Sequence, residues 1–397
     1  MSVPRLSLLA IPILGIMTGN AALSLDMYLP AFPAIAQDFA IGEAGVQITM
    51  STFLAGFAIG QAFYGPLSDT FGRRPVILVS LLIYGLISAL CAMSGTIDDL
   101  IIMRALQGLA GASGSVLGRA VIRDVYDGPR LAKAMSMLML VLTAAPMAAP
   151  MLGSVVLDLW HWRGIFWTLS AYACLWSMLI FITIPETLRV SRRVSIRPSA
   201  VMLAFAQVLG HKRAMGYTLT AGLGFAGMFV YLTATPFIYM EIFDISPRGY
   251  ALFFAANIAA MATSTFINGR LVGRLGTDRM LGFFVGVLVV SSIVLLATGL
   301  SGFGGVWGLA VPLFFYVGSL SPVAANCITG TLQFFGHTAG TASSVFGVVQ
   351  FGIGSVAGWV VSIMNDATPA PMVYLIIVCA LLSACSFWVL ARERESL

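Results

Sequence analysis

Charge is what this sequence has least of. Only 9% of its 397 residues are Asp, Glu, Lys or Arg, against about 25% in a typical soluble domain. By contrast, 59% of the residues are hydrophobic and the mean hydropathy is +0.96. A soluble chain of this length cannot hide so much apolar surface. The composition therefore excludes an ordinary soluble domain and indicates a protein embedded in a lipid bilayer.

Groups that bind metals or perform covalent chemistry are also scarce. The 3 His (His161, His211 and His337) lie in or beside expected loops, and no metal-site spacing links them. The 5 Cys all fall in apolar runs, which favours small buried side chains over ligands: Cys91, Cys174, Cys327, Cys379 and Cys385. There is no phosphate-binding loop of the G-x-x-x-x-G-K-[ST] type either. We expect no metal, no cofactor and no enzymatic activity, with an ion gradient as the energy source.

Apolar runs long enough to cross a bilayer recur along the whole chain, since a spanning helix needs about 20 such residues. We predict an all-α integral membrane protein with twelve spans, at residues 7–29, 44–64, 75–94, 98–122, 131–157, 164–184, 214–240, 249–268, 280–299, 305–326, 339–364 and 370–391. The first run follows Met1–Arg5 without a small-residue cleavage site, so we interpret it as an uncleaved helix rather than a signal peptide.

The basic residues predict the orientation, because Lys and Arg accumulate in cytoplasmic loops. With the N-terminus inside, the opposite loops contain only Arg163 and Arg248, and both termini are cytoplasmic. The cytoplasmic set is Arg5, Arg73, Arg74, Arg123, Arg130, Lys133, Arg189, Arg192, Arg193, Arg197, Lys212, Arg213, Arg270, Arg274, Arg279, Arg392 and Arg394. Scattered among short loops, these cations explain the net charge of +5 without a nucleic-acid partner.

The longest polar interruption divides the predicted spans into two sets of six. We predict an N-terminal bundle over 1–185, a cytoplasmic linker over 186–213 with an amphipathic helix at 198–210, and a C-terminal bundle over 214–397. The segment GPLSDTFGRRP at 65–75 is echoed at the same place in the second half by NGRLVGRLGTDR at 268–279. Two equivalent halves are a known transporter design, with the substrate site near mid-membrane between the repeats.

Three motifs resemble those of one family. GPLSDTFGRRP is similar to the loop-2/3 signature of the major facilitator superfamily, and Arg104-Ala-Leu-Gln107-Gly108 resembles its R-x-x-Q-G motif. The run APMAAPMLG, with Pro146, Pro150 and Gly153, resembles the antiporter motif of that superfamily, although Ala145 replaces the usual glycine. Together with RDVY at 123–126, SLDMYLPAFP at 24–33 looks like the Bcr/CflA branch of bicyclomycin- and chloramphenicol-type exporters.

This resemblance implies a drug:proton antiporter of the bacterial inner membrane. It would expel small amphipathic drugs by alternating access between two six-helix bundles, and a monomer is enough for that architecture. A proton-coupled importer with the same fold is the alternative. A membrane enzyme needs a nucleophile–base pair or a metal cluster, and a channel needs a continuous polar stripe; the sequence contains neither.

Asp26 is the only acid well inside a predicted span. An ionised carboxylate at membrane depth costs about 2.5–3.5 kcal/mol on insertion scales, so Asp26 is our candidate for proton coupling. An interfacial position, or a cap on a helix break before Pro30, is the alternative. Arg104 lies at similar depth and is either the electrostatic partner of Asp26 or a packing residue that bonds backbone carbonyls.

The remaining candidates form two groups. The cytoplasmic latch consists of Gly65 and Gly72, which allow a tight turn, with Asp69, Arg73, Arg74 and Asp124 as the charges that pair there. Substrate contacts are expected from polar and aromatic residues within spans, although each aromatic residue is equally compatible with core or lipid contacts: Tyr28, Arg119, Phe225, Phe229, Asn257 and Asn326. Whether Arg119 faces the cavity stays open.

Overall fold

The computed structural model describes residues 10–126, 128–188, 191, 193, 198–335 and 338–392, and every regular element in those ranges is a helix. Ten of the described helices are long and apolar enough to cross a membrane. His337 and the predicted cytoplasmic residues Arg5, Arg189, Arg192, Arg197 and Arg394 lie outside these ranges.

The chain folds into two compact units. The first comprises Met1–Ile41 with Thr52–Val201, and the second comprises Gly42–Ser51 with Met202–Leu397. The long helix α4 (Glu43–Phe71) therefore contributes its first two turns to the second unit and the rest to the first. The bundle limits predicted from the sequence remain a prediction.

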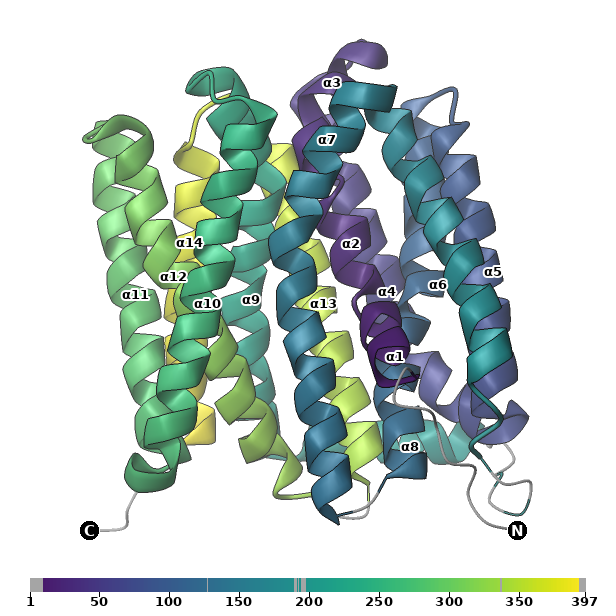
Figure 1. The fold of residues 1–397 in the computed structure, drawn as a ribbon. Helices are drawn as coiled ribbons and strands as arrows, with labels where there is room; N and C mark the ends of the chain where they lie inside the picture. The colour runs from purple at the N-terminus through teal and green to yellow at the C-terminus, as the bar shows by residue number, and fades with distance from the viewer. Residues whose placement is uncertain are drawn as a thin grey trace, which may run out of the picture. The chain divides into compact units, whose positions relative to one another are not determined.

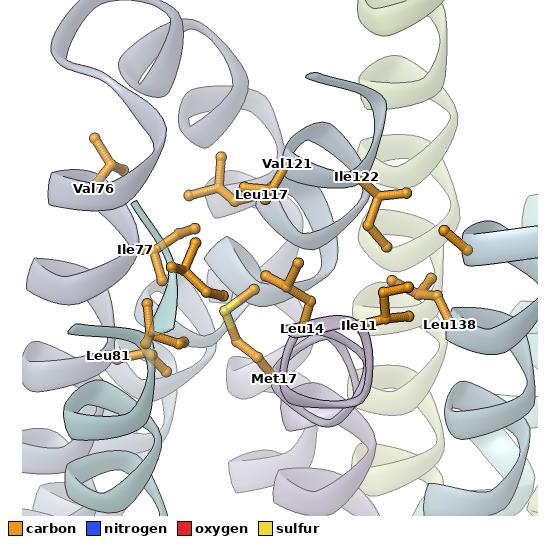
Figure 2. Close-up of a cluster of buried hydrophobic side chains, with 13 residues drawn as sticks. Ile11, Leu14, Met17, Val76, Ile77, Leu81, Leu117, Val121, Ile122 and Leu138 are labelled. Atoms are coloured by element: carbon orange, nitrogen blue, oxygen red, sulfur yellow. The ribbon is translucent and has the colours of Figure 1, made fainter. Parts of the chain in front are cut away.

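The first unit is built from α1 (Ala10–Thr18), α2 (Asn20–Asp26), α3 (Phe32–Asp38), most of α4, α5 (Arg73–Ala92), α6 (Ile97–Val125) and α7 (Gly128–Thr183). Its core at one end is a cluster of aliphatic side chains from α1, α5, α6 and α7, with Leu14, Leu81 and Leu117 at 0–1% exposure. Figure 2 shows Leu14 and Met17 of α1 in one cluster with Leu81 and Leu117.

The second unit contains α9 (Lys212–Phe237), α10 (Pro247–Leu275), α11 (Thr277–Ser301), α12 (Gly305–Leu332), α13 (Ala339–Met364) and α14 (Ala370–Ser386). Helix α9 packs against α12, α13 and α14, and α11 packs against α12, as Figure 1 also shows. Tyr217, Phe284 and Cys327 lie in its buried core, at 1%, 5% and 0% exposure. The prediction of buried cysteine side chains is confirmed for Cys91, Cys327 and Cys379 and is wrong for Cys174 and Cys385, which are exposed.

Three sequence-based boundaries were wrong. The first predicted span is broken at Gly19 into α1 and α2 and ends at Asp26 rather than at residue 29. Helix α4 continues through Gly65 and Pro66 to Phe71, so the predicted ten-residue turn reduces to the single residue Gly72. The fifth and sixth spans are separated only by non-helical Trp160 and His161, without a longer loop.

The linker contains the predicted helix. Helix α8 (Pro198–Gly210) occupies 198–210. Its Val208 is 1% exposed in a small cluster with Ala342 and Val345 of α13, whereas Met202 and Leu203 are exposed. Both its packed face and its exposed face thus carry apolar side chains, so the helix is confirmed and its amphipathic character stays a prediction.

Candidate functional site

Asp26 is the last residue of α2 and is 5% exposed. Its side chain makes no hydrogen bond and no ion pair with any residue in the described ranges, and no other acid there is buried. Buried carboxylates without a partner are rare because ionisation away from water is costly. The position therefore suits a carboxyl group that gains and loses a proton.

The backbone around Asp26 is irregular. Helix α2 ends there, and a single 3-10 turn at Leu29–Ala31 with Pro30 at its start leads into α3. Proline removes a backbone donor and stops the preceding helix. The helix break that the sequence offered as an alternative is therefore present, but Asp26 does not cap it with a side-chain bond.

The antiporter-type motif reaches the same place. Gly153 of α7 packs so closely on Met27 that a Cβ atom at residue 153 would overlap the Met27 carbonyl group. Pro146 is half-buried and Pro150 is buried on the same helix, which continues through both prolines. The residue after Asp26 is thus in close backbone contact with α7.

Arg104 is buried in α6 at 0% exposure. Its Nη1 donates to the carbonyl of Ser24 at 3.2 Å and to Oε1 of Gln107 at 2.6 Å. Its guanidinium carbon lies 4.5 Å from the ring centre of Tyr28 and 4.4 Å from that of Phe53. The carbonyl and amide oxygens at Nη1 and the two aromatic faces thus take the place of a carboxylate, whereas Nε and Nη2 have no hydrogen-bond partner among the described residues.

Asp26 and Arg104 do not form an ion pair, although Arg104 bonds the carbonyl of Ser24, two residues before Asp26. Both interpretations of Arg104 left open by the sequence are compatible with this geometry. Its bonds fix α6 to α2, and an electrostatic action of its charge on Asp26 stays a prediction.

A polar network continues from Arg104 through the first unit. Gln107 Nε2 donates to Ser88 Oγ at 2.8 Å, and Ser24 Oγ lies 2.6 Å from the hydroxyl of Tyr84. Both amide atoms of buried Asn20 lack a hydrogen-bond partner in the described part of the chain. Sequence reasoning missed Asn20, although an amide six residues before Asp26 in an apolar run was a visible signal.

The predicted latch centres on Arg73. Its Nη1 lies 2.6 Å from Asp69 Oδ1, its Nε donates to Asp124 Oδ2 at 3.0 Å, and Nη1 also donates to Ser68. Arg73 thus joins α4, α5 and α6 through one guanidinium group, and Asp124 pairs with Arg73 rather than with Arg74. Arg74 donates to the carbonyl of Phe181 at 2.6 Å and stacks on its ring.

Glu186 was not singled out from the sequence, yet it completes this latch. Its carboxylate accepts from the backbone amides of Arg73 at 3.0 Å and Arg74 at 3.3 Å, which open α5. Anions are stabilised at helix N-termini by free amides and by the helix dipole. Glu186 therefore accepts from the first amides of α5, and Asp69 pairs with Arg73.

The predicted substrate contacts are dispersed. Tyr28 is 0% exposed and Phe229 is 4% exposed, whereas Phe225 is half-buried. In the second unit, Asn257 donates to Tyr231 at 2.8 Å.

Two further candidates differ in exposure. Asn326 is 3% exposed and donates to Asn268 at 2.9 Å. Arg119 has an exposed side chain whose Nε donates to the carbonyl of Ser115. The roles of all these residues in substrate binding stay predictions.

The protein is a multi-pass membrane transporter. It has apolar helices of membrane-spanning length, a buried polar core in the first unit and a charged turn between α4 and α5. The chain belongs to the Major Facilitator Superfamily, whose family model matches residues 14–359. It is 32% identical to the bicyclomycin resistance protein homolog of Haemophilus influenzae, over 96% of each chain.

Other known proteins agree with this membership. The chloramphenicol resistance protein of Pseudomonas aeruginosa is 29% identical, over 89% of this chain and 84% of its own. The solved structure of a D-xylose-proton symporter is 15% identical but has the same fold, with a TM-score of 0.76 over 98% of this chain and 99% of its own. The protein is thus a transporter of a family that is not one of enzymes, with bacterial relatives named for drug resistance.

Proposed function

We propose that this protein exports small amphipathic drugs across the bacterial inner membrane in exchange for protons, with both termini in the cytoplasm. The observation that carries the proposal is Asp26, a buried carboxyl group without a partner among the described residues. The next residue, Met27, is in close backbone contact with Gly153 of α7. The names of the relatives supply the class of cargo.

Asp26 is the coupling group in this proposal. While its surroundings open to the cytoplasm it releases a proton, and substrate enters. After the bundles rearrange, substrate leaves and Asp26 takes a proton from outside. Proton and substrate need not share an atom, because each only has to bias the same equilibrium between two conformations.

The other proposed roles follow from position. Arg104 shifts the protonation equilibrium of Asp26 through its charge. The ion pairs of Arg73 with Asp69 and Asp124 hold the cytoplasmic side of the first bundle together, and Glu186 supports them by capping α5. The proposed substrate contacts remain Tyr28, Arg119, Phe225, Phe229, Asn257 and Asn326. No cofactor or further partner is needed, and a monomer is enough.

Reconstitution in liposomes with an imposed pH gradient tests both the coupling and its direction. An antiporter concentrates drug on the acidic side, because protons leave that side as drug enters it, whereas a symporter concentrates drug on the alkaline side. We expect accumulation on the acidic side by the native protein and none by Asp26→Asn, which should still bind drug.

The matched control is Asp98→Asn, which changes an exposed acid in the first turn of α6. It should transport like the native protein. Gradient-driven accumulation by Asp26→Asn at the native level would move the coupling role to another group. Accumulation on the alkaline side would favour the importer.

A further inference from the structure

An aromatic pocket lies in the second unit and is lined by α10, α12 and the π-helical turn η3 (Ile238–Ile242) that follows α9. Its volume is about 290 Å³, close to the lower end of the range for small-molecule sites. The mechanism proposed above does not use this pocket. Its walls include five aromatic rings and one amide: Tyr239, Phe253, Asn257, Trp307, Phe314 and Phe315.

The spacing of these residues along two packed helices brings them to one place. Phe253 and Asn257 are one turn apart on α10. Trp307 and Phe314 are two turns apart on α12, which packs against α10, so each pair lies on one helix face. The ring centre of Phe253 lies 5.4 Å from that of Trp307 and 5.2 Å from that of Tyr239. Because Trp307 is 64% exposed, the pocket opens at the surface of the unit.

Two buried polar side chains line this pocket with an atom to spare. Asn257 is 5% exposed and its Nδ2 donates to the hydroxyl of Tyr231 at 2.8 Å, but its Oδ1 accepts no hydrogen bond from any described residue. Tyr239 is 1% exposed, and its hydroxyl has no hydrogen-bond partner among the described residues either. Neither atom is sealed off by protein, and both residues line the pocket. Since buried polar atoms are normally hydrogen-bonded, we expect an occupant that bonds to both.

These two atoms distinguish the possible occupants. A lipid tail fits aromatic walls but cannot bond to either atom. Water can bond to both, but the pocket is far larger than the roughly 10–15 Å³ that one water molecule needs, and most of its wall is apolar. No charged side chain of the described residues lines the pocket, which disfavours an ion. An uncharged ligand with an aromatic ring, a donor and an acceptor matches the whole wall.

We propose that this pocket binds an uncharged aromatic amide or alcohol. The N–H or O–H of the ligand donates to Asn257 Oδ1, its oxygen accepts from the Tyr239 hydroxyl, and its ring packs against Phe253 and Trp307. The inference rests on the proposed function for the small amphipathic class of the cargo, but binding is measured without transport. The π-helical turn that carries Tyr239 fits a binding role, because π-bulges are frequent at functional sites.

Quenching of tryptophan fluorescence tests the site, because Trp307 forms part of its wall. The probe is 4-nitrobenzamide, an uncharged aryl amide whose nitro group quenches indole emission, added to the full-length protein in lipid nanodiscs. We expect saturable quenching of the native protein, and a smaller saturable part in Trp307→Phe. N,N-Dimethyl-4-nitrobenzamide has no N–H and should bind about tenfold more weakly, because it leaves a buried acceptor without a donor.

Two variants locate the contacts. Asn257→Leu should weaken the binding of 4-nitrobenzamide about tenfold but should not weaken that of the dimethyl compound, since only the former donates to Oδ1. Tyr239→Phe keeps the ring and should weaken both probes severalfold, because both have the carbonyl group. It also decides the matter if Asn257→Leu does not fold. The matched control is Tyr316→Phe, which should bind like the native protein: Tyr316 is fully buried, donates to the carbonyl of Gly224 and does not line the pocket.

The contrary outcomes are distinct. Equal affinity of the native protein for the two amides, or native affinity in Tyr239→Phe, would overturn the proposal. Tighter binding of 4-nitrobenzyl-trimethylammonium than of 4-nitrobenzamide would make the aromatic wall a cation site and would overturn it as well. Asp26→Asn should bind 4-nitrobenzamide like the native protein. Binding without gradient-driven accumulation of drug would contradict the proposed function alone, whereas drug accumulation without saturable quenching would contradict the pocket alone.

Discussion

At the scale of single residues, Arg104 poses the main question, because it is a buried cation that pairs with no acid among the described residues. Its planar guanidinium group stacks on the rings of Tyr28 and Phe53. The same group donates hydrogen bonds to the Ser24 carbonyl and to Gln107, and these contacts together stabilise the buried charge. Lysine has the same charge but neither the planar face nor the fork of donors. The substitution Arg104→Lys therefore separates the charge from the packing.

We predict that Arg104→Lys lowers the free energy of unfolding by about 1–3 kcal/mol, because stacking and donors are lost in a desolvated place. If the charge tunes Asp26, the drug moved per proton should stay close to native. Thermal unfolding in detergent and coupled transport in liposomes measure the two effects. Arg270→Lys is the control, because Arg270 also stacks at 4.1 Å, on Phe266, but is exposed. Lost coupling in a stable Arg104→Lys protein would contradict a purely electrostatic role.

Residue chemistry was more predictable from the sequence than residue partners were. Asp26 and Arg104 stand out in the sequence because charge inside an apolar run is costly. Their partners come from other helices: Ser24 and Tyr28 for Arg104, and α7 at Gly153 for the segment beside Asp26. Glu186 escaped notice because its task, capping α5 from 113 residues away, leaves no local pattern.

At the scale of elements, helix ends are set by capping more than by hydropathy. Helix α5 starts at Arg73 because Gly72 turns the chain at φ 101° and because Glu186 accepts its first amides. Hydropathy placed the end of α4 at residue 64, since it registers the polar residues that follow but not the backbone hydrogen bonds that continue the helix to Phe71.

We predict that Glu186→Ala destabilises the protein by about 0.5–2 kcal/mol, the usual cost of a lost helix cap. Glu186→Gln should cost less, because an amide oxygen still accepts from the Arg73 and Arg74 amides although the charge is gone. Thermal unfolding and hydrogen exchange of the first turn of α5 measure this. Equal exchange in Glu186→Ala and native protein would show that α5 does not need the cap.

The kink in α7 gives a prediction about pH. Arg163 donates to Asp38 Oδ2 at 2.6 Å, and the indole of Trp162 donates to the same oxygen at 3.1 Å. The hydrogen bond from Arg163, followed by that from Trp162, lowers the pKa of Asp38 below its usual value. A carboxyl group with a depressed pKa adds stability above its unfolded pKa of about 3.9 and loses it as the pH falls through the folded pKa.

We therefore expect native stability to fall below about pH 4 by more than that of Asp38→Asn. The effect should stay under about 1 kcal/mol, because the Asp38 side chain is 42% exposed. Unfolding temperatures between neutral and acidic pH, in low and high salt, measure it. Asp98→Asn, at an exposed acid, is the control and should keep the native acid limb. An identical acid limb in Asp38→Asn would mean that the pair adds no stability.

At the scale of the whole molecule, the two halves have a glycine with positive φ at equivalent turns. Gly72 has φ 101° and ψ 158° before α5, and Gly276 has φ 85° and ψ 156° before α11. The sequence echo between 65–75 and 268–279 predicted similar turns, and the backbone angles agree. The side chains differ: Glu186 and the end of Arg193 cover Gly72, whereas no atom of the described residues lies within 4 Å of the place where a Cβ atom of Gly276 would be.

Because of this difference, alanine substitutions at the two glycines test how much the surrounding side chains of each half contribute to the stability of the turn. Gly276→Ala should cost only the strain of a positive φ, about 1–3 kcal/mol. Gly72→Ala adds to that strain an overlap with Glu186 Oε2, which displaces the carboxylate from the Arg73 and Arg74 amides. We expect it to cost about 1 kcal/mol more, the value of the lost cap.

A double-mutant cycle isolates the extra term. In a Glu186→Ala background there is no carboxylate to displace, and the flexible end of Arg193 can move away from the new Cβ atom. Gly72→Ala and Gly276→Ala should then cost the same within about 0.5 kcal/mol. Unfolding of the four variants and their parents in one detergent measures the cycle. An excess cost of Gly72→Ala that persists without Glu186 would place the difference in the backbone of the first turn, and the two halves would then differ in more than the side chain that covers the glycine.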